Sequence, residues 1–327
     1  MVAVLLALAL AGAGGQPLAP SAKPVQISGR LITPDGRPLH SADIVIRALQ
    51  AQPRPAGGAR IEPDGHFTFE NVPPGDYIIR ARGVSESGDT ALVATFRVSA
   101  EGRDIRDLEL MMAPGGVIEG RVTVRARHGH TPPALTSLRI ATLLEDGTDF
   151  GTASRPVGHN GRFRLSGVIP GTHVLVIEGL PFPWQIARAR PAGLGIAANS
   201  FLVERNQQFR DVEVVLSDTA ARVTGTVSSS KDPGAGCTVA AIPIDASRRQ
   251  VPVRFVRSAL VQPDGRYELS DLVPGEYALV AIAGLDQAVL MKPDVLDRLA
   301  GQDTRIAVAE GQVARVALET CHAAPRP

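Results

Sequence analysis

Apolar and polar residues alternate in short runs along this chain, and three of the runs share one pattern. They read PDGHFTFENVPPGDYIIRARG (63–83), HNGRFRLSGVIPGTHVLVIEG (159–179) and PDGRYELSDLVPGEYALVAIAG (263–284). Alternation with a period of two predicts a half-buried strand in each run, followed by a turn and a second, more apolar strand. Three copies of one strand–turn–strand unit predict three copies of one structural module.

Two turns mark every copy at the same spacing. An Asp-Gly or Asn-Gly pair opens the copy, and such pairs tolerate positive φ and close tight hairpins. A Pro-Gly pair follows, with its glycine ten residues after the first glycine, and an aromatic residue or histidine stands two residues further on. The predicted turn and core signature therefore comprises Asp64, Gly65, Gly75 and Tyr77, then Asn160, Gly161, Gly171 and His173, and finally Asp264, Gly265, Gly275 and Tyr277.

Further strands flank each copy. An opening strand that contains a glycine precedes it (27–32, 118–124 and 222–227), and a closing strand follows it (106–112, 210–216 and 314–319). The opening glycines Gly29, Gly120 and Gly225 recur after 91 and 105 residues, which suits a seven-stranded sandwich.

We therefore predict an all-β chain of three tandem antiparallel β-sandwich modules of the immunoglobulin-like type, at 24–113, 114–218 and 219–321. A leader (1–23) would precede them and a tail (322–327) would follow. Only residues 288–301 suggest a short helix. The joints are short, so we expect an elongated, modestly bent rod.

The first copy resembles the carboxypeptidase regulatory-like domain, through GRLITPDGRPLHSADIVIRA (29–48), PDGHFTF and VPPGDYIIRARG. The third copy follows the pattern well and the second less closely, because it has His173 and Asn160 in place of tyrosine and aspartate. The resemblance implies a prealbumin-like β-sandwich, related to collagen-adhesin B-type repeats and starch-binding-like domains. It also implies a secreted, non-catalytic module that stabilises, spaces or binds, and it names no ligand.

Charge and motifs exclude several functions. The 34 basic residues nearly balance the 33 acidic ones, which leaves no basic footprint for nucleic acid. Zinc-peptidase, Walker-loop and calcium-loop motifs are absent from the sequence. The stretch GLGIAA (193–198) matches a dinucleotide fingerprint by pattern alone, without the strand–turn–helix context that the motif needs. Asp64 and Asp264 belong to turns, and His173 occupies a tyrosine position. His128 and His130 could share a metal, but no ligand is near them in sequence, so we expect a solvated loop. We therefore predict that the chain is not an enzyme and that it binds no cofactor or metal.

One aromatic segment, GLPFPWQIARAR (179–190), is the candidate ligand-binding surface, through Phe182, Trp184 and Arg188. Starch-binding-like domains hold glycans by stacking aromatic rings on sugars, and tryptophan is frequent in protein hot spots. The alternative, which the sequence favours, is that Trp184 caps the core of module two or the joint with module three.

The first 13 residues, MVAVLLALALAGA, have the apolar run and small-residue end of an export signal. No later segment has 18 uninterrupted apolar residues, so no transmembrane helix is expected. Cys237 and Cys321 both fall in module three, and parallel first and last strands would bring them to one pole. A disulfide and two unrelated thiols are equally supported.

We predict a secreted, periplasmic or envelope protein with a structural, adhesive or protein-interaction role, whose partner is an envelope protein or a glycan. The alternative is a carbohydrate-binding protein that uses the loops of the starch-binding-like fold.

Overall fold

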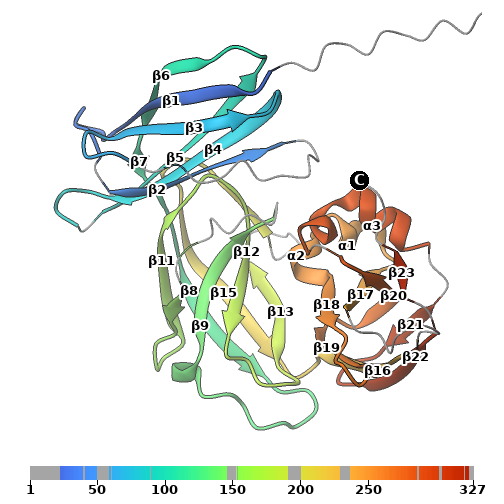
Figure 1. Cartoon of the computed structure of the whole chain (residues 1–327). Helices are drawn as coiled ribbons and strands as arrows, with labels where there is room; N and C mark the ends of the chain where they lie inside the picture. Colours follow the sequence, from blue (N-terminus) through green and yellow to red (C-terminus); the bar gives the residue numbers. More distant parts are fainter. Residues whose placement is uncertain are drawn as a thin grey trace, which may run out of the picture.

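The computed structural model describes residues 23–39, 41–49, 59, 61–88, 90–145, 152, 154–190, 200–228, 236–285, 287–301, 304–319 and 321–323. The expected export signal lies outside these residues. Within them the strands form six sheets, two in each of three successive parts of the chain (Figure 1). The prediction of an all-β chain of tandem sandwiches is confirmed. No helix in the described ranges is long and apolar enough to cross a membrane.

Module one consists of a three-stranded and a four-stranded sheet. The first has the order β3-β1-β6, with β1 antiparallel to β3 and parallel to β6. The second has the order β2-β4-β5-β7. The core between them includes Ile27, Phe67, Tyr77 and Ile79. The strands are β1 (Val25–Ile32), β2 (Ala42–Ala48), β3 (His66–Val72), β4 (Gly75–Val84), β5 (Ala91–Ala100), β6 (Ile105–Met111) and β7 (Ala113–Pro114).

Module two repeats this plan with two four-stranded sheets, β11-β8-β15-β13 and β10-β9-β12-β14. Its opening strand β8 is again parallel to its closing strand β15. The elements are β8 (Gly116–Arg125), the 3-10 helix η1 (Leu135–Ser137), β9 (Arg139–Leu144), β10 (Arg155–Pro156), β11 (Arg162–Val168), β12 (Gly171–Glu178), β13 (Gln185–Arg190), β14 (Ser200–Val203) and β15 (Gln208–Ser217).

Module three pairs the sheet β19-β16-β22 with β18-β17-β20-β21, and β23 adds to β20. Short helices cover the outer face of the second sheet through an apolar cluster that includes Ile242, Val280, Leu290 and Leu296. Helix α3 and η2 fall where the sequence predicts a short helix. The elements are β16 (Ala221–Val227), β17 (Cys237–Pro243), α1 (Ala246–Arg249), α2 (Pro252–Phe255), β18 (Arg257–Leu260), β19 (Arg266–Leu272), β20 (Gly275–Ala283), η2 (Gln287–Met291), α3 (Pro293–Leu299), β21 (Arg305–Val308), β22 (Val313–Leu318) and β23 (His322–Ala323).

Each opening glycine lies where the closing strand passes very close to the backbone of the opening strand, so the position has no room for a side chain. A Cβ atom added at Gly29, Gly120 or Gly225 would overlap a backbone carbonyl oxygen of the closing strand in its own module. Any side chain would push the parallel opening and closing strands apart. The regular spacing of these glycines in the sequence therefore indicates that the opening strand of each module pairs with its closing strand.

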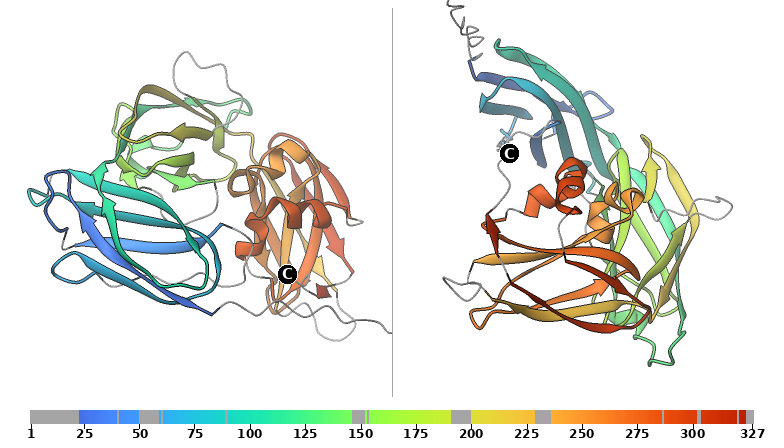
Figure 2. Two further views of the ribbon diagram at one scale, coloured as in Figure 1. Left: turned by 90° about the horizontal axis from the view of Figure 1, so that it is seen from above. Right: turned by 90° about the vertical axis from the view of Figure 1, so that its right-hand side faces the viewer.

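The chain bends at the second joint. Module two continues below module one, whereas module three lies beside module two, as the views in Figures 1 and 2 agree. The bend is therefore stronger than the modest one expected from the short joints, and it creates an interface along the side of module two.

Candidate functional site

The Asp-Gly and Asn-Gly pairs form the same side-chain-capped turn in all three modules. The side-chain Oδ1 atom of the first residue accepts a hydrogen bond from the backbone N–H two residues later, at 3.0 Å in each case. The following glycine has a φ of 78°, 78° or 82°. The residues are Asp64 and Gly65, Asn160 and Gly161, and Asp264 and Gly265. The carboxylates of Asp64 and Asp264 and the side-chain amide of Asn160 therefore stabilise these turns.

The Pro-Gly turns are each closed by one buried side chain. The Tyr77 hydroxyl donates to the carbonyl oxygen of Pro73 at 2.8 Å, and the Tyr277 hydroxyl donates to that of Val273 at 2.6 Å. The Nε2 atom of His173 makes the same bond, 2.7 Å long, with the carbonyl oxygen four residues earlier.

A carbonyl oxygen can only accept, so the His173 ring carries its proton on Nε2. Histidine therefore replaces tyrosine in the same corner. The glycines of these turns, Gly75, Gly171 and Gly275, have φ values of 150°, 148° and 153°.

The aromatic segment of module two is mostly engaged inside the protein. Trp184 is 2% exposed, packs in the core of module two, and donates from Nε1 to the carbonyl oxygen of Thr131 at 3.2 Å. The Arg222 guanidinium lies 4.1 Å from the centre of the Phe182 ring.

Arg188 forms an ion pair with Glu213 at 2.6 Å. An exposed stacking platform made from Phe182, Trp184 and Arg188 is therefore wrong. The indole packs in the core of module two, as the alternative favoured by the sequence has it.

Asp218 is the centre of the joint between modules two and three. Its carboxylate is fully buried and accepts hydrogen bonds from the backbone N–H groups of Arg127, His128 and His130, the last two at 2.9 and 3.2 Å. The His130 ring adds a fourth bond from Nδ1 at 3.1 Å. Burial alone would raise the pKa of Asp218, but these four bonds outweigh it and hold the pKa well below its usual range.

The same loop reaches across to module three. Arg127 forms an ion pair with Glu310 at 3.0 Å, and His128 Nε2 lies 3.5 Å from the other Glu310 oxygen. The histidine pair is exposed, and its loop also takes part in the joint. In the described part of the chain, no group of three or more His, Cys, Asp or Glu residues is placed to hold a metal.

The joint between modules one and two is apolar. Val93 of β5 packs with Leu144 and Ile169 of module two in a buried cluster, and Val45 of β2 packs against it. The Gly115 N–H donates to the carbonyl oxygen of Ala91 at 3.0 Å, which ties the connecting segment to module one. Both joints are therefore closed by direct contacts.

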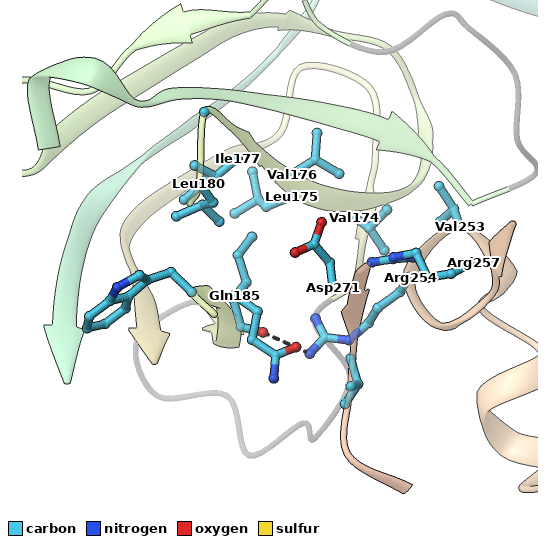
Figure 3. A pocket seen from close by; sticks show the side chains of 14 residues that line it. Val174, Leu175, Val176, Ile177, Leu180, Gln185, Val253, Arg254, Arg257 and Asp271 are labelled. Atoms are coloured by element: carbon cyan, nitrogen blue, oxygen red, sulfur yellow. Dashed lines mark hydrogen bonds between the residues drawn. The ribbon is translucent and has the colours of Figure 1, made fainter. Parts of the chain in front are cut away.

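A cleft of about 310 Å³ lies along the interface that the bend creates. On one side, β12 and the residues after it contribute the apolar side chains of Val174, Val176, Ile177 and Leu180. On the other side, the residues of module three include Arg254, Arg257 and Asp271. Figure 3 shows both guanidinium groups and the carboxylate projecting into this space.

Arg254 bridges the interface, because its Nη2 donates to the Ile186 carbonyl oxygen of module two at 3.3 Å. Burial, with help from the like charges of Arg257 and Arg248, lowers the pKa of Arg254 to about 10. Burial also lowers the pKa of Arg257, which Asp271 partly opposes. Within the described ranges, neither cleft arginine forms an ion pair with a carboxylate. The candidate segment 179–190 supplies part of one side of this cleft. Sequence reasoning missed the other side, because isolated arginines in RFVRS (254–258) look like ordinary surface residues.

Cys237 and Cys321 form a disulfide whose Cα atoms are 6.3 Å apart. Cys237 begins β17 and is buried, and Cys321 follows β22. Strand β22 runs parallel to β16, the arrangement on which the sequence argument for a bridge depends.

Comparison with known proteins gives a family match for the first module. Residues 26–110 match the sequence model of the carboxypeptidase regulatory-like domain. No curated protein matches the chain. Solved structures that the comparison matches to this chain include the TIE protein of Bacillus anthracis, with 11% identity over 91% of this chain and 51% of that one and a TM-score of 0.23. This chain thus spans about half the length of that protein.

Two pilins are also similar. The minor pilin of Streptococcus agalactiae has 15% identity over 59% of this chain and 95% of that one, with a TM-score of 0.28. The major pilin subunit of Bacillus cereus has 9% identity over 91% of this chain and 99% of that one, with a TM-score of 0.23. The family match agrees with the resemblance of the first repeat: residues 26–110, most of the β-sandwich of module one, are similar to the carboxypeptidase regulatory-like domain.

Proposed function

We propose that this chain is an exported, non-catalytic scaffold, which holds three β-sandwich modules in one fixed arrangement and presents their surfaces to a protein partner in the cell envelope. The observation that carries the proposal is the construction of the second joint. A buried carboxylate organises the loop of module two that contacts module three, and a flexible linker would need no such group. The apolar first joint supports the same conclusion.

The roles of the reactive side chains favour a structural function. Asp64 and Asp264 cap turns, His173 closes a corner, and Asp218 organises a joint. Each of these groups makes a hydrogen bond that stabilises the fold, and we infer that its role is structural rather than catalytic. A broad screen for peptidase and glycosidase turnover with the purified chain should give no activity above a mock preparation. Turnover that co-purifies with the protein would contradict the non-catalytic role.

The cysteine pair supports export, because structural disulfides persist in oxidising compartments. The bridge closes a loop across 84 residues, and in the chain-entropy model such a loop adds about 4–5 kcal/mol to stability. Non-reducing peptide mapping of native protein from envelope and culture fractions should recover a peptide pair linked through Cys237 and Cys321. Two thiols that alkylate freely in those fractions would contradict export into an oxidising compartment.

A further inference from the structure

We propose that the cleft between modules two and three is a binding site for a monocarboxylate attached to an apolar group, the chemistry of a peptide C-terminus that ends in an apolar residue. This site goes beyond the proposed scaffold function. It follows from the shape and charge of the interface, and it holds whether or not the chain has an envelope partner.

The apolar half of the site comes from the outer face of module two. In β12, Leu175 points into the core, whereas its neighbours Val174 and Val176 lie on the opposite face of the strand. Val176 is only half-buried, although module three covers part of this face, and the half-buried Leu180, which also packs against the core of module two, lines the same cleft. The cleft therefore keeps an apolar wall that a ligand side chain could cover, and transfer of that side chain from water would favour binding.

The charged half comes from module three. Arg254 uses one N–H to bond the Ile186 carbonyl oxygen, and Arg257 uses Nη1 to bond the Val256 carbonyl oxygen at 2.9 Å. A guanidinium has five N–H donors in a planar fork, so most donors of both groups remain for a ligand. A carboxylate matches that fork and forms charge-assisted hydrogen bonds with it.

The charge balance selects a single negative charge. Two arginines and one aspartate, Asp271, give the lining a formal charge of +1. Burial and like charges already act against the protonated form of Arg254, and a carboxylate beside it would relieve that opposition. A monocarboxylate neutralises this charge, whereas a doubly charged phosphate would leave a net negative charge beside Asp271. The volume of about 310 Å³ is at the lower end for small-molecule sites, which suits one amino-acid residue.

Trp184 provides a direct readout, because it is the only tryptophan of the chain and is among the residues that line the cleft. Titration of the full chain with N-acetyl-leucine should give a saturable change in tryptophan emission. N-acetyl-leucinamide has the same apolar group without the charge, and it should bind at least tenfold more weakly. Acetate, which has the charge without the side chain, should also bind at least tenfold more weakly.

Two variants of opposite sign test the assignment of charges. Arg254→Gln should weaken binding of N-acetyl-leucine at least tenfold, whereas Arg162→Gln, an exposed arginine of β11, should leave it unchanged. Asp271→Asn should tighten binding at least twofold, because it removes the opposing charge. This second variant keeps the test valid if Arg254→Gln loosens the interface.

Equal affinity for the acid and the amide, or weaker binding by Asp271→Asn, would overturn the site. No saturable signal with the acid would also overturn it. Failure of these titrations leaves the geometry of the joints untouched, so it is distinguishable from failure of the scaffold function, which is a loss of fixed module positions.

Discussion

Replacement of Asp218 by alanine should strongly destabilise the joint and the adjoining part of module two. The substitution removes the acceptor for the N–H groups of Arg127, His128 and His130 and for the His130 ring. Hydrogen bonds to a charged group contribute about 1.5–3 kcal/mol each, and they are not additive. The His130 side chain is half-exposed, so water can replace part of what is lost. Loss of one member of a buried charged network typically costs about 3–5 kcal/mol, and we expect a value in that range.

Urea unfolding followed by Trp184 emission measures this cost, because the indole bonds to Thr131 immediately after the loop that Asp218 holds. With a urea slope of about 2 kcal/mol per molar, a cost in the middle of that range should lower the midpoint by roughly 2 M. Asp294→Ala is the matched control: its side chain is 67% exposed and contacts Arg298 only at 3.9 Å. The control should shift stability by less than about 0.5 kcal/mol. Equal midpoints for the two variants would refute the role of Asp218.

The pH dependence of module two should follow the same carboxylate. The folded state holds the pKa of Asp218 well below its usual range, whereas an unfolded aspartate titrates near a pKa of about 3.9. The contribution of the ionised Asp218 to the free energy of unfolding is therefore fully present above about pH 4 and is lost as the pH falls further. The wild-type chain should lose stability steeply below about pH 4. Asp218→Asn, which cannot ionise, should show a shallower slope, and identical slopes would contradict the assignment.

Three further predictions concern single modules. Tyr77→Ala removes a buried aromatic residue and its bond to Pro73, so it should cost about 3–5 kcal/mol and expose module one to protease while module three stays resistant; simultaneous cleavage of all modules would contradict independent units. Reduction of the bridge between Cys237 and Cys321 should lower the stability of module three by about 4 kcal/mol, and an unchanged transition in reductant would count against that. Trp184 emission should be blue-shifted and poorly quenched by acrylamide in the free protein, because the indole is 2% exposed; a red-shifted, quenchable signal would place it at the surface.

The sequence predicts the parts of this fold that depend on local chemistry. Alternating residues define strands, and the capped turns at Asp64 and Asp264 need only neighbouring atoms. The opening glycines record a strand contact through their period, because the close approach recurs in every module. His173 is predictable as a structural residue because the repeat places it in the position of Tyr77.

The joints and the cleft are not predictable in this way. The His130 ring contacts Asp218, about 90 residues further along the chain, and the His128 ring contacts Glu310, about 180 residues further along. No rule of sequence spacing links these residues. The cleft around Arg254 arises from the bend, which depends on how two folded modules pack. Trp184 shows the same limit on a smaller scale, since its segment fits either a core or an exposed platform until the sheets are in place.

The fixed arrangement of the modules is the central claim, and a distance measurement between modules one and three tests it most directly. Nitroxide labels on cysteines introduced at Glu70 and Ala317, both exposed strand positions, report that distance by pulsed electron resonance while the native cysteines remain bridged. We predict one narrow distance distribution for the otherwise wild-type chain and a clearly broader one when Asp218→Ala is added. A distribution that is already broad without Asp218→Ala, and that this substitution does not widen, would show that the joints are flexible and would contradict the scaffold.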